Sequence, residues 1–255
     1  MQESSVMDFN DKVVMVTGAS RGIGESAARL FAARGGHVIV SSRKTESVEA
    51  VAASIRDAGG KATALACHVG DADAVETAFA TIAADFGRLD VLVNNAATNP
   101  HFGHIAETPL TMVDKTVEVN IRGYFHMSQK AALMMKEQGG GAIVNTSSIN
   151  GVRPGPYQGI YSITKAAVIS MTQAFAKECA AWSVRVNAVL PGLTDTRFAA
   201  ALTQNEQMLN MILPLIPLHR VADPDEIAPA IVFLASDDAS YITGAALPVD
   251  GGFLA

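Results

Sequence analysis

The chain has 255 residues, of which 49% are hydrophobic, and 19 basic against 25 acidic residues give it a net charge of −6. This length suits one domain with a large core over residues 1–255, because no Pro-, Ser- or Gly-rich linker divides the sequence. The acidic balance and the lack of a basic run argue against nucleic acid and against an anionic membrane surface as partners.

The two ends and the cysteines favour a cytoplasmic protein. The amino end, MQESSVMDFNDK, has no apolar run of signal-peptide length, and no later segment has the roughly 18 unbroken apolar residues of a spanning helix. The carboxyl end, GGFLA, carries no organelle-addressing tripeptide. Cys67 and Cys179 lack metal-ligand spacing, so we expect buried thiols and no metal.

A glycine-rich turn follows the first predicted strand. Residues 12–17, KVVMVT, form a continuous β-branched run that is typical of a central parallel strand. The glycines at 18, 22 and 24 follow at once, and a helix is predicted over residues 25–34. This order allows backbone N–H groups and the helix N-terminus to approach a pyrophosphate, where a side chain would be in the way. The candidate cofactor-binding residues of this turn are Gly18, Ser20, Arg21, Gly22, Ile23 and Gly24.

The second predicted strand, residues 37–41, favours NADP(H) over NAD(H). An acidic residue at its end would accept hydrogen bonds from a ribose 2′-hydroxyl and repel a 2′-phosphate. None is present; Ser42, Arg43 and Arg21 instead offer donors and positive charge for the extra phosphate. The alternative is that Arg43 and Lys44 simply begin a solvated helix.

Two more strands complete the first half. A helix, a strand, a second helix and a strand are predicted over residues 45–58, 61–67, 71–86 and 89–93. His68 and Val69 follow the third strand. Asn94, Asn95 and Ala96 follow the fourth, where small side chains allow a cofactor to come close.

The second half begins with a loop over residues 99–107 and a long helix over residues 111–138 that holds Asn120. The loop contains His101 and His104. No carboxylate or cysteine cluster accompanies them, so we expect them to line a pocket or face water rather than bind a metal.

Three polar side chains surround the next strand-to-helix connection. A buried strand is predicted over residues 142–146, a loop over 150–159, and a helix over 161–181. Ser148 closes the strand, and Tyr161 and Lys165 lie one helical turn apart on one face. An ammonium beside a phenol favours the phenolate, so we expect Lys165 to lower the pKa of Tyr161 from its ordinary value of about 10. Tyr161 then exchanges a proton with an alcohol or carbonyl oxygen that Ser148 holds.

The pattern Y-x-x-x-K occurs often by chance, and an exposed Tyr and Lys is the alternative interpretation. The serine upstream and the glycine turn disfavour it.

The last predicted elements are a strand over residues 184–190, a helix over Pro224–Ala235 and a strand over Ala246–Val249. Residues 197–218 contain several methionines, which adapt to irregular apolar ligands, so a substrate lid is predicted there; a core-packing helix is the alternative.

The glycine spacing T-G-x-x-x-G-x-G resembles that of the short-chain dehydrogenase/reductase family, rather than G-x-G-x-x-G. The other family motifs are in order: Asn94-Asn95-Ala96-Ala97, Asn120, Ser148, Tyr161-x-x-x-Lys165 and Pro191-Gly192. Within the family, SSRK, CHVG, NAATNPHFG and DASYITG resemble NADP-dependent carbonyl and retinol reductases of the dehydrogenase/reductase member 4 type. The resemblance implies an α/β three-layer sandwich with a doubly wound, mostly parallel, seven-stranded, Rossmann-like sheet.

The resemblance also implies an activity: hydride transfer between NADP(H) and a carbonyl or secondary alcohol. Ser148 would polarise the oxygen, Tyr161 would carry its proton, and Lys165 would also hold the nicotinamide ribose. Asn120 would bind a water that links Lys165 to solvent.

Further cofactor contacts are implied by position. The backbone near Thr194 and the Thr196 hydroxyl would hold the carboxamide and a phosphate. The family usually has Asp in place of His68, where it helps to frame the adenine; His68 and the backbone of Val69 are the candidate contacts there. The remaining implied cofactor-binding residues are Asn94, Ala96, Pro191 and Gly192.

Several rival functions exist on the same fold. A 3-oxoacyl carrier-protein reductase binds an acidic partner through basic residues near the ends of its two long helices, where this chain has Gly139-Gly140-Gly141 and Ala181-Trp182-Ser183. An NAD-dependent sugar or alcohol dehydrogenase is a further alternative. An extended-branch epimerase or dehydratase has T-G-x-x-G-x-x-G spacing, which differs from the spacing in this chain. A cofactor-sensing module on this fold tends to lose the tyrosine or lysine, and this chain keeps both Tyr161 and Lys165.

The family packs its two long helices against two-fold mates, which implies a homotetramer. Small residues on these helices suit close approach. We expect Met127, Met134, Met135 and Phe175 to face a partner subunit, because burial inside one subunit explains only one face of each helix.

Overall fold

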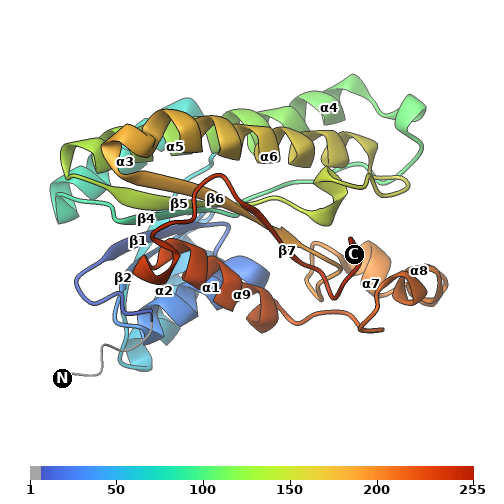
Figure 1. Ribbon diagram of the computed structural model, residues 1–255, viewed down its shortest axis with the longest axis horizontal. Helices are drawn as coiled ribbons and strands as arrows, with labels where there is room; N and C mark the ends of the chain where they lie inside the picture. Colours follow the sequence, from blue (N-terminus) through green and yellow to red (C-terminus); the bar gives the residue numbers. More distant parts are fainter. Residues whose placement is uncertain (1–6) are drawn as a thin grey trace.

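The computed structural model describes residues 7–255, and the first six residues of the amino end analysed above lie outside it. Seven parallel strands form one sheet in the order β3-β2-β1-β4-β5-β6-β7 (Figure 1). They are β1 Val13–Thr17, β2 His37–Ser42, β3 Lys61–Ala66, β4 Val91–Asn94, β5 Gly141–Thr146, β6 Val184–Pro191 and β7 Ala246–Val249. The predicted doubly wound α/β sandwich is confirmed.

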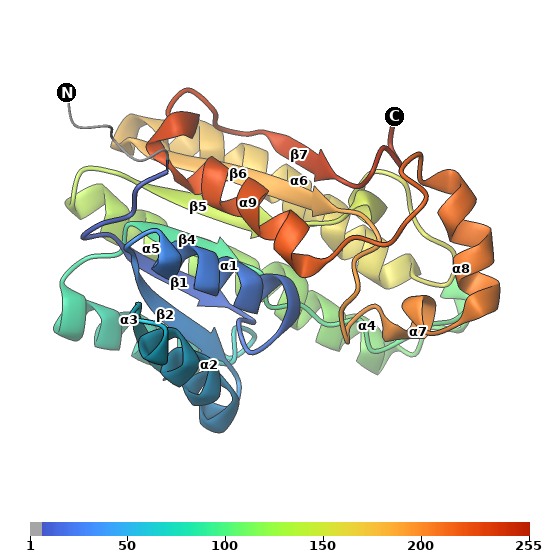
Figure 2. The ribbon, with the colours of Figure 1, turned by 90° about the horizontal axis from the view of Figure 1, so that it is seen from below.

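Helices cover both faces of this sheet, so the central strands are buried on both sides, as their continuous apolar runs require (Figures 1 and 2). One face carries α1 Gly22–Ala33, α2 Thr45–Asp57 and α9 Pro224–Ala235. The other carries α3 Ala72–Phe86, α5 Tyr124–Glu137 and α6 Gly159–Cys179. Short 3₁₀ turns connect them: η1 Ile105–Glu107, η3 Ile149–Gly151, η4 Ala180–Trp182, η5 Leu213–Leu215 and η6 Asp237–Ala239.

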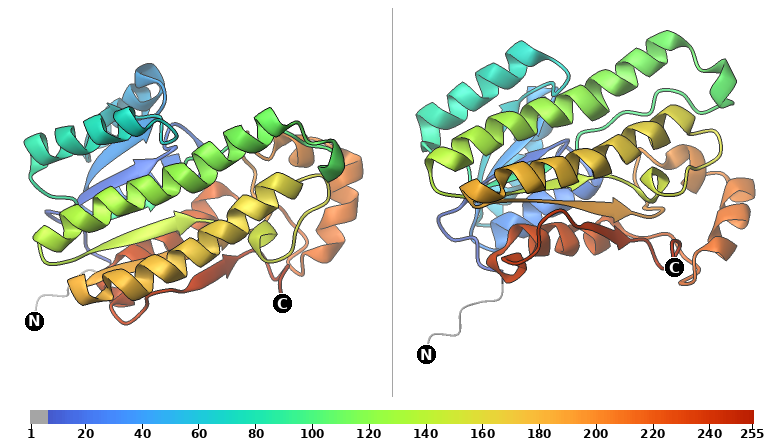
Figure 3. Two further views of the ribbon diagram at one scale, coloured as in Figure 1. Left: turned by 90° about the horizontal axis from the view of Figure 1, so that it is seen from above. Right: turned by 45° about the horizontal axis from the view of Figure 1, so that its top comes forward.

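The long helix predicted over residues 111–138 is not uniform. It consists of α4 Leu110–Val117, a π-helical turn η2 Glu118–Gly123, and α5. The three follow one another along a line that lies beside α6 (Figure 3). π-Helical turns occur most often at functional sites, and this one contains Asn120.

Of the four apolar side chains that we expected to face a partner subunit, two are buried inside the subunit and two are partly buried. Met127 and Met135 are fully buried in the core between α5 and the sheet, so that expectation is wrong for them. Met134 and Phe175 are only partly buried. A π-helical turn upstream shifts the register of α5, which a uniform helical wheel does not reproduce.

The segment predicted as a lid extends beyond the carboxyl ends of β6 and β7 (Figure 2). It contains α7 Ala200–Thr203, α8 Glu206–Ile212 and η5.

Both cysteines are free and buried, and burial raises the pKa of Cys67 to about 11. Within residues 7–255, no helix has the length and apolarity to cross a membrane, and no three metal-ligating side chains cluster.

Candidate active site

The glycine turn after β1 is clamped to the end of β4. The Thr17 hydroxyl accepts hydrogen bonds from the backbone N–H groups of Asn95 (2.9 Å) and Ala96 (3.1 Å). The Asn95 side-chain amide donates to the Thr17 carbonyl at 3.1 Å. Gly18 has φ +65°, and a Cβ atom there would lie 2.8 Å from the Ala96 Cα. Only glycine fits this position.

The same turn presents the free end of α1. A Cβ at Gly24 would lie 2.5 Å from the Gly18 carbonyl oxygen, so the helix starts close to the turn. The helix begins at Gly22, three residues before the predicted start, and the exposed Arg21 gives it no side-chain cap. Its first N–H groups therefore lack a side-chain acceptor and fit a pyrophosphate oxygen. Ile23 packs against the core.

Segments far apart in the sequence meet around this turn. A Cβ at Gly22 would lie 3.2 Å from the Thr196 methyl carbon. The N–H of Ala19 donates to the carbonyl of Ser41, in β2, at 3.0 Å. The predicted nucleotide residues Ser42 and the exposed Arg43 follow directly, so the turn and the end of β2 form one surface. These residues fit a dinucleotide.

The residues after β3 are held by other contacts. His68 Nδ1 accepts the Gly70 N–H at 2.9 Å, and His68 Nε2 lies 3.3 Å from the Lys115 Nζ. Lys115 in turn pairs with Glu118 at 2.7 Å. The Val69 carbonyl lies against η2, where a Cβ on Gly123 would approach it to 2.8 Å. Both nitrogens of His68 are thus engaged inside the protein.

The Asn94 side chain is buried and bonded within the protein, so only its main chain is left for the predicted cofactor contact. Its amide donates to the Ser128 hydroxyl and to Asn145 Oδ1, both at 2.9 Å. Side chains of consecutive strand residues point to opposite sides, so Asn95 faces the glycine turn instead. Thr17 and Asn95 belong to the predicted motifs but were not among the candidate cofactor-binding residues; the structure shows that their side chains hold the turn in place.

Ser148, Tyr161 and Lys165 come together as predicted. The Ser148 hydroxyl donates a hydrogen bond to the Tyr161 phenol, and accepts the Asn150 N–H at 3.1 Å. Lys165 Nζ lies 5.5 Å from the centre of the Tyr161 ring and donates to the Thr146 carbonyl at 2.7 Å. All three side chains are buried, at the carboxyl end of β5 and the start of α6.

Burial reverses the expected direction of the Tyr161 pKa. Burial penalises the phenolate and raises the pKa of Tyr161 to about 12, against the opposing hydrogen bond from Ser148. The expectation that Lys165 lowers this pKa is therefore wrong for the protein by itself. The physical reason is the burial of the phenol itself; burial also lowers the pKa of Lys165, to about 7.

The Asn120 side chain bridges three elements. Its amide donates to the Thr98 carbonyl at 2.9 Å and to the Thr164 hydroxyl at 3.1 Å, and its Oδ1 accepts the Thr98 N–H at 2.9 Å. Both amide hydrogens are thus used within the protein. Asn120 thus fixes the loop after β4 against α6, where its partner Thr164 directly precedes Lys165.

The residues after β6 form the remaining wall. Pro191 ends the strand, and a Cβ on Gly192 would lie 2.7 Å from the Asp250 Cα. Thr194 is buried, and its hydroxyl donates to the Gly192 carbonyl at 3.1 Å, so this hydroxyl is bonded within the protein. The Thr196 hydroxyl accepts the Ala199 N–H at 3.2 Å.

Aromatic rings surround Tyr161. The Phe198 ring centre lies 5.5 Å from that of Tyr161, and Phe102 and Tyr157 pair at 5.9 Å. The Gly103 N–H donates to the Tyr157 carbonyl at 3.0 Å, which joins the loop after β4 to the start of α6. Phe102, Tyr157 and Phe198 are each about half exposed. Of the three, Phe198 contacts Tyr161 directly.

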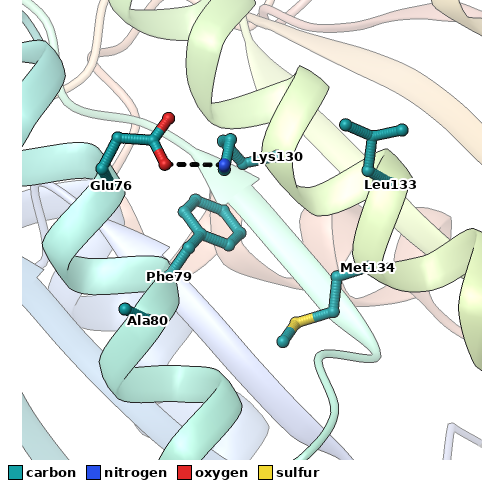
Figure 4. A pocket seen from close by; sticks show the side chains of 6 residues that line it. All are labelled: Glu76, Phe79, Ala80, Lys130, Leu133 and Met134. Atoms are coloured by element: carbon teal, nitrogen blue, oxygen red, sulfur yellow. Dashed lines mark hydrogen bonds and ion pairs between the residues drawn. The ribbon is translucent and has the colours of Figure 1, made fainter.

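A separate cavity of about 330 Å³ lies between α3 and α5 (Figure 4). Its lining combines the ion pair of Glu76 and Lys130, at 2.7 Å, with apolar side chains. The lining residues are Glu76, Phe79, Ala80, Lys130, Leu133 and Met134. None of the predicted site residues lines it, so it is not part of the candidate active site.

A family model described as enoyl-(acyl carrier protein) reductase matches residues 18–254. Dehydrogenase/reductase SDR family member 4 of Homo sapiens is 37% identical over 242 residues, which cover 95% of this chain and 87% of that protein. The crystal structure of a short-chain type dehydrogenase/reductase from Mycobacterium marinum has a TM-score of 0.92 at 33% identity, and covers 97% of both chains. The crystal structure of a gluconate 5-dehydrogenase from Burkholderia cenocepacia, in complex with NADP and tartrate, has a TM-score of 0.94 at 28% identity, and covers 97% of both chains.

These likenesses extend over nearly the whole chain and include the glycine turn and the helix that carries Tyr161 and Lys165. The chain belongs to the short-chain dehydrogenase/reductase family and is an NAD(P)-dependent oxidoreductase.

Proposed function

We propose that the chain transfers a hydride between NADP(H) and a carbonyl or secondary-alcohol substrate at Ser148, Tyr161 and Lys165. The observation that carries this proposal is the hydrogen bond from Ser148 to a buried Tyr161 phenol, with Lys165 Nζ beside the same ring. When bound, the nicotinamide cofactor supplies the hydride chemistry. The protein supplies position and proton transfer.

Each side chain has one role in the reductive direction. The Ser148 hydroxyl donates a hydrogen bond to the substrate oxygen and orients it. Tyr161 is neutral at pH 7, because its pKa is about 12, and it donates its proton to that oxygen. Protonated Lys165 then stabilises the phenolate that remains, and also holds the nicotinamide ribose. Asn120 positions α6 through Thr164 and, through its main chain, binds the water of the proton path.

The predicted cofactor residues would hold the dinucleotide in two ways. The turn and the end of β6 offer backbone and small side chains: Gly18, Ser20, Gly22, Ile23, Gly24, Val69, Ala96, Pro191, Gly192, Thr194, Thr196 and the main chain of Asn94. Ser42, Arg43 and Arg21 would bind the 2′-phosphate, which favours NADP(H) over NAD(H). The NADP named for the similar gluconate 5-dehydrogenase supports this preference. His68 would border the adenine.

We propose an apolar, ring-containing substrate and residues 197–218 as its lid, within one domain over residues 1–255. Phe102, Tyr157 and Phe198 offer the exposed apolar surface that such a substrate covers. The gluconate dehydrogenases among similar structures keep a second candidate open, a polar sugar acid. A 3-oxoacyl carrier-protein is the third candidate substrate. The absence of basic residues from Gly139-Gly140-Gly141 and Ala181-Trp182-Ser183 counts against it.

NADPH consumption with a panel of ketones, quinones, retinoids, sugar acids and an acyl carrier-protein conjugate tests this proposal. We expect turnover with aromatic or other apolar ketones, and little with gluconate-type substrates. Turnover confined to sugar acids, or to the carrier-protein conjugate, would replace the apolar substrate by that rival. A chain that consumes NADPH with none of them contradicts the proposed reaction.

We propose that the chain is a cytoplasmic homotetramer assembled through α4, α5 and α6. Phe125, Leu133 and Ile163 on these helices are about half exposed, and Phe125 pairs with Phe175 at 5.3 Å. Such apolar faces are typical of subunit contacts. Light scattering at micromolar concentration tests the assembly, and a mass near that of one 26.6 kDa chain contradicts it.

A further inference from the structure

A second tyrosine is buried beside Lys165 and has no role in the mechanism above. Tyr124 is the first residue of α5, directly after the π-helical turn, and only 1% of it is exposed. Its ring centre lies 5.1 Å from Lys165 Nζ. Its hydroxyl donates to the Thr146 carbonyl at 3.2 Å, the same oxygen that accepts from Lys165 at 2.7 Å.

Lys165 Nζ therefore lies close to two phenol rings. The Tyr161 ring centre is 5.5 Å from it and the Tyr124 ring centre 5.1 Å. The negative face of an aromatic ring attracts a cation at such distances, and the attraction is stronger where water is excluded. Lys165 is only 1% exposed. The two rings and one carbonyl thus replace part of the hydration that the ammonium loses.

Three elements each place one group against the Lys165 amine. α5 contributes the Tyr124 phenol, β5 the Thr146 carbonyl, and α6 the Tyr161 phenol. Burial lowers the pKa of Lys165, and no charged side chain within residues 7–255 contributes to this shift. Burial and the nearby Tyr161 hold the pKa of Tyr124 well above its usual value, so Tyr124 stays neutral and cannot act as a base.

We propose that Tyr124 is a positioning residue, whose ring holds the Lys165 ammonium against the end of β5 and beside Tyr161. Its hydroxyl fixes the ring by donating to the Thr146 carbonyl, one peptide before Ser147-Ser148. The role of Tyr124 in turnover rests on the proposed function, but its effect on the Lys165 amine does not. Loss of the ring destabilises the ammonium, so the amine loses its proton at lower pH.

Titration of Lys165 by nuclear magnetic resonance tests this effect without turnover. Lysine labelled at Cε is introduced, and the Lys165 signal is assigned by its loss in Lys165→Met. We expect Tyr124→Leu to lower the Lys165 pKa by about one unit, and Tyr124→Phe, which keeps a ring, to leave it near the wild-type value. Phe31→Leu removes an equally buried ring from the opposite core and should leave it unchanged.

Equal Lys165 titration in wild type and Tyr124→Leu overturns the proposal, and so does an equal shift in Tyr124→Phe and Tyr124→Leu. If Tyr124→Leu does not fold, Tyr124→Phe with a progressively fluorinated ring provides the test. Fluorine weakens the negative ring face at nearly constant shape, so each step should lower the Lys165 pKa. A titration that is insensitive to fluorination contradicts the proposal.

Turnover separates this inference from the proposed function. In the reductive reaction, the alkaline limb of the kcat profile should move to lower pH in Tyr124→Leu by the same amount as the Lys165 titration. A shift in the titration without any turnover in wild type leaves the positioning role intact and refutes the proposed reaction. Turnover whose alkaline limb is the same in both proteins refutes the positioning role.

Discussion

The cofactor side and the catalytic side of the site are built from different materials. The glycine turn is formed by backbone at close approach, with Gly18 pressed on Ala96 and with Thr17 and Asn95 clamping it. The catalytic side is formed by buried polar side chains, Tyr161 and Lys165, whose pKa values move in opposite directions. The first is a matter of shape and the second of solvation, so they should fail in different ways.

The catalytic side should show the largest effect. Tyr161→Phe removes the hydroxyl that donates the proton, and we expect kcat to fall by about 10²- to 10⁴-fold with little change in NADPH affinity. Steady-state kinetics and a cofactor fluorescence titration measure the two quantities. Tyr241→Phe, at a fully exposed tyrosine that has no part in the proposed site, is the matched control. A Tyr161→Phe enzyme that keeps most of its activity would remove Tyr161 from the mechanism.

The cofactor side should lose binding rather than turnover chemistry. Gly18→Ala forces a Cβ to within 2.8 Å of the Ala96 Cα at φ +65°, and we expect the NADPH Kd to rise by about tenfold or more. Gly59→Ala is the control, since Gly59 has φ +86° and nothing within 4 Å of an added Cβ. It carries the same backbone strain without the clash. Equal Kd changes in both variants would mean that backbone strain, and not the close approach of Gly18 to Ala96 in the glycine turn, governs NADPH binding.

The nucleotide preference should respond more weakly. Arg43→Asp removes one charge-assisted pair to the 2′-phosphate and adds repulsion, so the preference should move at least about tenfold toward NAD. The ratio of kcat/KM for NADPH and NADH measures it. Lys61→Asp makes the same charge change at the amino end of β3, the neighbour of β2, and Arg43 follows the carboxyl end of β2. A wild-type preference for NADH, or equal shifts in both variants, contradicts the role of Arg43.

The same division explains what the sequence could and could not predict. The β-branched run of β1 and the glycines after it act through local backbone geometry, so the strand and the glycine turn could be predicted from the residues alone. The sequence could not choose between the neighbours Asn94 and Asn95, because which side of β4 faces the turn depends on the β1 partner. Solvation is likewise a property of the whole fold. The opposite pKa direction of Tyr161, the π-helical turn at Asn120 and the burial of Met127 all depend on what packs around them.

Lys165 offers the most direct test of solvation. Its pKa is about 7 in the folded protein and 10.5 ordinarily, so between these pH values the unfolded chain binds a proton that the folded chain does not. The free energy of unfolding should therefore rise with pH over this window, by at most about 1.4 kcal/mol per pH unit from this group. The pKa of Tyr161 is raised from 10 to about 12, so its opposite contribution, a loss of stability, begins only near pH 10.

Lys165→Met removes this slope, because it keeps the apolar stem and has no proton to lose. The variant should be more stable than wild type by the largest margin at pH 7 and below, and the margin should shrink as the pH rises toward 10. Urea unfolding midpoints across this range measure it. Lys177→Met, on the exposed face of the same helix, should follow wild type at every pH. If wild type and Lys165→Met show parallel pH curves, the ammonium is better solvated than its burial implies, and the contrast between the two sides of the site does not hold.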